Sequence, residues 1–295
     1  MSIDQLFNKA REKGLSDFRS DYGYDENCGK HRKLLANAEK KLRNTLTKTN
    51  DVPSYDDPFI VDAYLDTYHL QHCRLAYWVF KYLFNQFDVP NALYVCDVGA
   101  GTQAGCIGLA LALSEYKEKP AVYFDAYEPS DAMWNAGHYF WSAFRDSVGA
   151  NFDPDPCSTL PHRLPDNLPD NALRVVTALH LSLPYDRNEN NKEEKAQNSL
   201  EKAFRLVSPE YGFFTCHKDK EDSLRQAVDN SYVWDKEKES KPCIPDKIKP
   251  YLPYLSPDAD SILLPTDSIL LPTDSILLLR EAAARRKADE QVRLK

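Results

Sequence analysis

The sequence predicts an α/β protein with a doubly wound, mostly parallel sheet and an N-terminal helical extension. Short apolar segments alternate with helical patterns of roughly 10 to 15 residues between about residues 90 and 230, which is typical of parallel sheets. A glycine cluster stands where the first apolar segment gives way to a helical pattern. The chain of 295 residues, 42% of them apolar, is also long enough to bury a large core.

The first predicted unit is a basic helical extension over residues 1–52. Leucines and alanines recur on a helical period between residues 30 and 48, with lysines and arginines opposite, so this segment is expected to be an amphipathic basic helix. The turn-rich stretch 50–58 ends it. Residues 59–87 carry too many large apolar groups for a surface helix and are predicted to form one or two helices on the core.

The second predicted unit, residues 53–235, contains these aromatic helices and the sheet. Four apolar segments indicate strands, at 93–98, 121–129, 172–179 and 211–217. Three stretches between them have helical patterns, at 106–113, 131–144 and 193–207. The proline- and aspartate-rich stretch 151–171 is interpreted as a loop, with the third strand-helix unit weak or missing.

The third predicted unit, residues 236–295, contains a repeated heptad. The sequence DSILLPT occupies 260–266 and 267–273, and a third DSILL begins at Asp274. Proline in two copies excludes a coiled coil, which leaves short edge strands or a flexible tether. The residues that follow are typical of a charged helix.

Charge is unevenly distributed along the chain. The net charge is −8, which argues against nonspecific polyanion binding by the whole molecule. Residues 1–50 carry +4 and residues 279–295 carry +3, whereas the remainder carries −15. The basic ends therefore indicate either arms that dock on a polyanion such as RNA or DNA, or solvated helices.

No apolar run reaches the length of a membrane span or of a signal peptide, so we expect a cytoplasmic protein. Seven cysteines without a C-x-x-C pair fit neither a disulfide framework nor a zinc ribbon, and a reducing compartment is expected. The spacing His69-x-x-His72-Cys73 offers metal ligands on one helix face. No second ligand group follows, so these residues are interpreted as polar positions on a buried helix, with no metal site.

The glycine cluster after the first predicted strand is the main candidate site. Glycines at a junction between a strand and a helix let the backbone approach a ligand beside free N–H groups. Gly99, Gly101 and Ala104 satisfy the dinucleotide pattern G-x-G-x-x-G/A. Asp97 favours a different ligand, because dinucleotide folds normally have an apolar residue there.

The pattern D-x-G-x-G, followed by Glu128 after the second predicted strand, resembles class I S-adenosylmethionine (SAM)-dependent methyltransferases. The resemblance implies a Rossmann-like sheet, SAM as cofactor, and a Glu128 carboxylate that accepts both ribose hydroxyls. It covers about half of the chain. The cofactor-binding residues it implies are Asp97, Gly99, Ala100, Gly101, Thr102, Gln103, Glu128 and Pro129.

Gln103 departs from that pattern, because the family often has a third glycine there. Within the superfamily, the segment from Asp97 to Thr102 is similar to the loop of mitochondrial small-ribosomal-subunit assembly methyltransferase-like proteins. That family also carries a cysteine group for an iron–sulfur cluster, and this chain lacks its spacing.

The segment Ser182-Leu183-Pro184-Tyr185 looks like a degraded form of the motif with which amino-group methyltransferases hold an exocyclic amine. The likeness implies that Ser182 accepts the amine hydrogens, Pro184 fixes the turn and Tyr185 stacks on a base. An ordinary strand exit with a half-buried tyrosine is the alternative.

Three functions stay open from the sequence. The first is a SAM-dependent methyltransferase acting on a nucleic-acid base or another macromolecule. The second is a non-catalytic SAM-fold factor that binds RNA or protein through the basic N-terminal helix. The third is a NAD(P)-dependent oxidoreductase that uses the same glycine loop.

Overall fold

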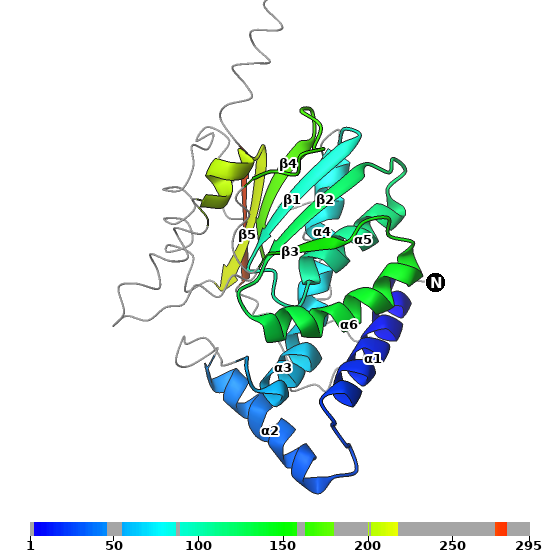
Figure 1. Ribbon diagram of the computed structural model, residues 1–295, viewed down its shortest axis with the longest axis vertical. Helices are drawn as coiled ribbons and strands as arrows, with labels where there is room; N and C mark the ends of the chain where they lie inside the picture. Colours follow the sequence, from blue (N-terminus) through cyan, green and yellow to red (C-terminus); the bar gives the residue numbers. More distant parts are fainter. Residues whose placement is uncertain are drawn as a thin grey trace, which may run out of the picture.

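The protein is described from a computed structural model that covers residues 3–45, 55–86, 89–157, 163–179, 200, 202–217 and 275–281. Its centre is a six-stranded sheet in the order β3-β2-β1-β4-β5-β6 (Figure 1). The first five strands in this order are parallel, and β6 pairs antiparallel with β5 at the edge. In chain order they are β1 Ala92–Val98, β2 Ala121–Tyr127, β3 Pro154–Cys157, β4 Leu173–Ala178, β5 Tyr211–His217 and β6 Ser275–Glu281.

Helices cover both faces of this sheet, so the predicted doubly wound, Rossmann-like fold is confirmed. One face packs against α4 (Leu70–Gln86), α5 (Ala104–Glu115) and α6 (Asp131–Val148). Helical residues 202–207 pack on the other face. Every residue of β1 is buried, because its alternate side chains enter the two opposite cores.

The described residues that precede β1 form five helical elements. They are α1 Ile3–Asp21, α2 Gly29–Asn44, α3 Pro58–Tyr64, the π-helix η2 Leu65–His69, and α4. The predicted basic helix corresponds to α2, and the predicted aromatic helices correspond to α3, η2 and α4. Helix α1 runs beside α6, where Phe7 and Phe144 meet edge to face with ring centroids 5.4 Å apart.

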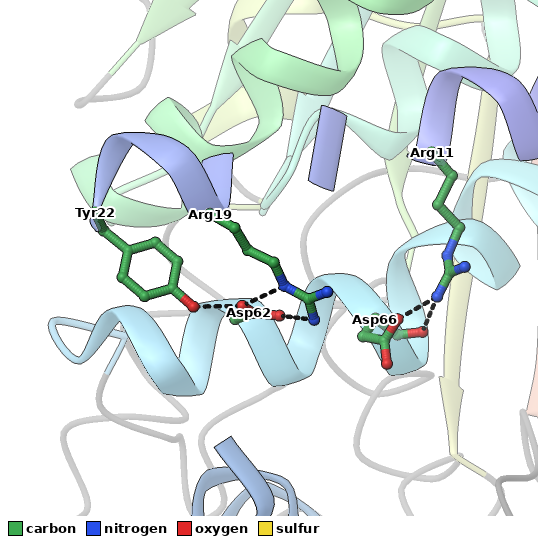
Figure 2. Close-up of polar contacts among 5 residues, drawn as sticks. All are labelled: Arg11, Arg19, Tyr22, Asp62 and Asp66. Carbon is green, nitrogen blue, oxygen red and sulfur yellow. Dashed lines mark hydrogen bonds and ion pairs between the residues drawn. The ribbon is translucent and has the colours of Figure 1, made fainter. Parts of the chain in front are cut away.

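Two ion pairs fix α1 to the α3–η2 segment (Figure 2). Arg19 donates from Nε and Nη2 to the two carboxylate oxygens of Asp62, at 2.8 and 2.7 Å. Tyr22 donates its hydroxyl to the same carboxylate. Arg11 pairs with Asp66 one turn further along. Asp62 is fully buried, so loss of its cation would leave an uncompensated charge in the core.

The stretch 151–171 was interpreted as a loop, and this interpretation was wrong for residues 154–157. Residues Pro154–Cys157 form β3, which pairs in parallel with β2 from Phe124 to Tyr127. The two prolines of this strand have no N–H to donate, which is tolerated because β3 is at the edge of the sheet.

The third heptad copy, from Ser275 onward, forms the edge strand β6. Leu279 stands in this copy where the first two copies have proline. The first two copies, the charged C-terminal residues and most of the predicted helix 193–207 lie outside the described residues. In the described part of the chain, no helix combines the length and apolar character needed to cross a bilayer.

Candidate functional site

The candidate site is the loop between β1 and α5, at the carboxyl ends of the strands. Here β1 has β2 on one side and β4 on the other, which is the topological switch point where open α/β sheets bind ligands. Gly99, Gly101 and Gln103 have positive φ values of 76°, 53° and 60°. Glycine adopts this conformation without strain, so the first two positions explain the glycine pattern of the loop.

The loop is tied to the end of β2 through its backbone. The N–H groups of Gly99 and Ala100 both donate to the carbonyl oxygen of Tyr127, at 2.9 and 3.0 Å. The N–H of Gly101 donates to Glu128 Oε2 at 2.7 Å. Three successive N–H groups of the loop are therefore already used inside the protein.

Glu128 stands directly after β2 and faces this loop. Its other carboxylate oxygen accepts from the N–H of Ser130 at 2.8 Å. Ser130 in turn caps α6 by accepting from the N–H of Met133. Burial raises the pKa of Glu128, and the hydrogen bonds from Ser130 and Gly101 oppose that rise. Pro129, the next predicted site residue, is exposed.

Asp97 lies beneath the loop, with 2% of the residue exposed. Its Oδ1 accepts from the hydroxyl of Thr177 on β4 at 2.7 Å. Its Oδ2 lies against Gly105 in the first turn of α5, where a Cβ atom would collide with it. Burial raises the pKa of Asp97 to about 7; the Thr177 hydrogen bond opposes this rise and the charge of Glu128 adds to it. Gly105 is thus required by a close approach between a helix and a carboxyl group.

Two of the predicted cofactor-binding residues are buried anchors of the loop. Thr102 is 1% exposed, and its hydroxyl is 2.6 Å from Nδ1 of His69. Gln103 is fully buried and donates its amide to the carbonyl oxygen of Trp134 on α6 at 3.1 Å. These contacts attach the loop to η2 and α6, so the accessible part of the predicted set is Gly99, Gly101, Glu128 and Pro129.

The π-helix η2 brings His69 to the loop. A π-helical turn shifts the side chains that follow it relative to a regular helix, and such turns are frequent at functional sites. Burial lowers the pKa of His69 to about 3, with the charge of Arg11 adding to the effect, so this imidazole is neutral at physiological pH. Its Nε2 also lies 3.5 Å from Cys73 Sγ. Among the described residues, no group of three metal-ligating side chains comes together.

A cluster of tyrosines from the helices before β1 lies next to the loop. Tyr64, the last residue of α3, holds its hydroxyl 2.8 Å from Nδ1 of His72. A Cβ atom at Gly101 would lie 4.0 Å from that hydroxyl, so the Tyr64 side chain is next to the loop. The rings of Tyr55 and Tyr68 each lie 5.8 Å from the ring of Tyr64. The sequence predicted only that residues 59–87 form helices on the core, because local patterns do not show which loop a helix contacts.

Gly137 on α6 allows that helix to approach the loop between β1 and α5 closely. A Cβ atom there would lie 2.5 Å from the carbonyl carbon of Thr102. The sequence signal for this contact is a glycine in the middle of a helix rich in aromatic residues. The other predicted residues Ser182, Pro184 and Tyr185 lie outside the described residues, so the structure does not test their proposed role.

No protein-family profile and no curated protein matches the chain. Solved structures do match. Magnesium protoporphyrin IX methyltransferase from Synechocystis PCC 6803, with bound SAM, is 13% identical and has a TM-score of 0.44; the match covers 83% of this chain and 97% of that chain. A putative class I SAM-dependent methyltransferase from Listeria monocytogenes is 11% identical, also with a TM-score of 0.44, over 94% of this chain and 80% of that chain. The fold assignment itself follows from the strand order.

Proposed function

We propose that the loop between β1 and α5 binds SAM and that the protein is a SAM-dependent methyltransferase. The observation that carries the proposal is Glu128, whose carboxylate is held 2.7 Å from the Gly101 nitrogen beside the switch point of the sheet. An ionised carboxylate has more acceptor positions than these two N–H donors occupy, so it can also accept ribose hydroxyls. A SAM-bound methyltransferase among the structural neighbours is consistent with this assignment.

The residues present fit such a cofactor. Gly99 and Gly101 have no side chains, so the backbone at these two positions can approach a ligand closely. Gly99 and Gly101 are also partly accessible, whereas Thr102 and Gln103 are buried. The backbone N–H groups of residues 99 to 101 are already bonded to Tyr127 and Glu128. A pyrophosphate would need such groups, so this loop favours SAM over a dinucleotide.

In the proposed reaction, SAM would supply the methyl group: the acceptor atom attacks the methyl carbon, the carbon–sulfur bond of the sulfonium breaks, and the neutral thioether leaves. Glu128 would hold the ribose, and the backbone of Gly99 and Gly101 would lie beneath the ligand. Tyr64 covers the opposite side, where its ring and the attached His72 help to exclude water. Alignment of the donor and acceptor accounts for most of the required catalysis, so the proposal needs no dedicated acid or base.

We further propose that the methyl acceptor is a nucleic-acid base or another macromolecule. The support is the basic N-terminal helix together with the motif Ser182-Leu183-Pro184-Tyr185. Incubation with labelled SAM and total RNA, DNA and protein should label one of these fractions. Bound SAM without any labelled fraction would favour a non-catalytic SAM-fold factor.

Calorimetric titration tests the cofactor assignment. Wild type is expected to bind SAM, and Glu128→Gln should weaken binding by about 10-fold or more, because hydrogen bonds to an ionised acceptor contribute about 1.5 to 3 kcal/mol. Glu118→Gln, in an exposed turn, is the matched control and should bind normally. Folded wild-type protein that binds NADH and not SAM would contradict the proposal.

A further inference from the structure

The outward face of α2 carries an unusual density of positive charge. Its inner face is apolar, since Leu35, Ala38 and Leu42 are buried in a cluster with Ile60 and Ala63 of α3. The helix contains a single acidic residue, Glu39. Six cations on it are exposed: Lys30, Arg32, Lys33, Lys40, Lys41 and Arg43.

These charges differ in kind from those of the neighbouring helix α1. On α1, Arg11 pairs with Asp66, Lys13 with Asp17, and Arg19 with the buried Asp62. These pairs hold the helix in place or stabilise it locally. Apart from Arg43, these exposed α2 cations form no ion pair with any residue in the described part of the chain.

The exposed lysines of α2 therefore gain no ion pair on folding, and only Lys41, in the last turn, is favoured by the helix dipole. Lys30 and Lys33 stand three residues apart, as do Lys40 and Arg43, and like charges at this spacing on a helix repel each other slightly. A face that opposes its own helix in this way is better explained by an external anion. The net charge of −8 for the whole chain makes the local excess on α2 more distinct.

Helix α2 is also close to the candidate site. It packs on α3, and α3 ends at Tyr64, whose hydroxyl lies above Gly101. Tyr64 and Tyr68 pack against the same apolar cluster as the inner face of α2. Helix α2 itself is therefore a neighbour of the tyrosines that contact the loop.

We propose that the exposed face of α2 binds the phosphodiester backbone of a nucleic acid and presents that strand to the loop between β1 and α5. Its 16 residues span about 24 Å, enough to follow several successive phosphates. A membrane surface fits less well, because the apolar face of α2 is already buried on α3. Among the described residues of α2, Leu34 is the one large apolar side chain left exposed for insertion into a bilayer. The role of the bound strand as a methyl acceptor rests on the proposed function; the binding itself does not.

Fluorescence anisotropy with a labelled single-stranded RNA of about 20 nucleotides tests the proposal on the full chain. The triple variant Lys33→Glu, Lys40→Glu, Lys41→Glu should bind about 10-fold or more weakly at about 0.1 M KCl. Its salt dependence should also fall by about 2 in log–log slope, because each lost phosphate contact removes about 0.7 for a single strand. A duplex DNA of similar length gives the same comparison for paired strands.

The matched control is Lys9→Glu, Lys117→Glu, Lys202→Glu, which changes the net charge equally at exposed positions elsewhere. It should stay within about 2-fold of wild type, since only local phosphate contacts are invoked. Equal loss in both triple variants would reduce the effect to net charge and overturn the proposal. Circular dichroism melting of both variants checks that each is folded.

Two further outcomes would also overturn it: no binding of either nucleic acid by wild type at low salt, or α2-dependent binding of phosphatidylglycerol vesicles without binding of RNA or DNA. Calorimetry with SAM separates this inference from the proposed function. RNA binding without SAM binding would contradict the methyltransferase and leave α2 docking intact. SAM binding without nucleic-acid binding would contradict α2 docking alone.

Discussion

Replacing Asp97 with asparagine should make the free energy of unfolding less dependent on pH. Burial raises the pKa of this carboxyl group to about 7, against about 3.9 in an unfolded chain. The folded state therefore holds the proton more tightly than the unfolded state does. The resulting stabilisation is fully present below about pH 4 and is lost as the pH rises through about 7.

Each pKa unit corresponds to about 1.4 kcal/mol, so the free energy of unfolding should fall by about 4 kcal/mol across the whole window from this group. Between about pH 5 and pH 8 the loss should be about 2.5 kcal/mol. Asparagine has nearly the same shape and can still accept from Thr177, but it does not titrate in this range. Asp97→Asn should therefore lack that loss.

Urea unfolding of wild type and Asp97→Asn at these two pH values measures the difference, and other titrating groups cancel in the comparison. Asp166→Asn is the control, because the Asp166 side chain is 79% exposed. The reasoning is refuted if Asp97→Asn and wild type lose the same free energy of unfolding between the two pH values.

Three further substitutions test the packing around the site, each by urea unfolding. Arg19→Met should lower the free energy of unfolding by about 3 kcal/mol, because it leaves the fully buried Asp62 without its cation; a loss below that of an ordinary surface pair would contradict the role of this bridge. Gly137→Ala should cost about 2 kcal/mol, because the new Cβ atom meets the backbone of Thr102. Gly149→Ala, at a φ of 63° with open space around it, should cost only about 1 kcal/mol; a larger loss than at Gly137 would reverse the expected order.

Much of the sheet could be predicted because its signals are local. Strands β1, β2, β4 and β5 are short apolar segments separated by helical patterns, and their order along the chain favours parallel pairing. Strand β3 was missed since its prolines look like a loop, and only its edge position makes them acceptable. Its existence depends on the partner strand, which local patterns do not include.

The sequence predicted which residues form the candidate site better than it predicted what each of them does. The sequence indicated Asp97, Gly101 and Glu128 through motif spacing, and the structure brings Gly101 and Glu128 into contact. It also shows that Thr102 and Gln103 are buried anchors, where the motif implied ligand contacts. Burial of a side chain depends on the helices that pack over it, so spacing alone does not distinguish an anchor from a ligand.

The sequence by itself determined the fold class, the glycine loop and the basic character of α2, because each is written in periodicity, glycine placement or charge along one segment. Only the tertiary structure decided that Tyr64 covers Gly101 and that burial raises the pKa of Asp97 to about 7. It also decided that Arg11, Lys13 and Arg19 of α1 are paired, whereas the lysines of α2 form no ion pair among the described residues. These properties arise between segments distant in the chain, where packing sets distance, desolvation and charge pairing.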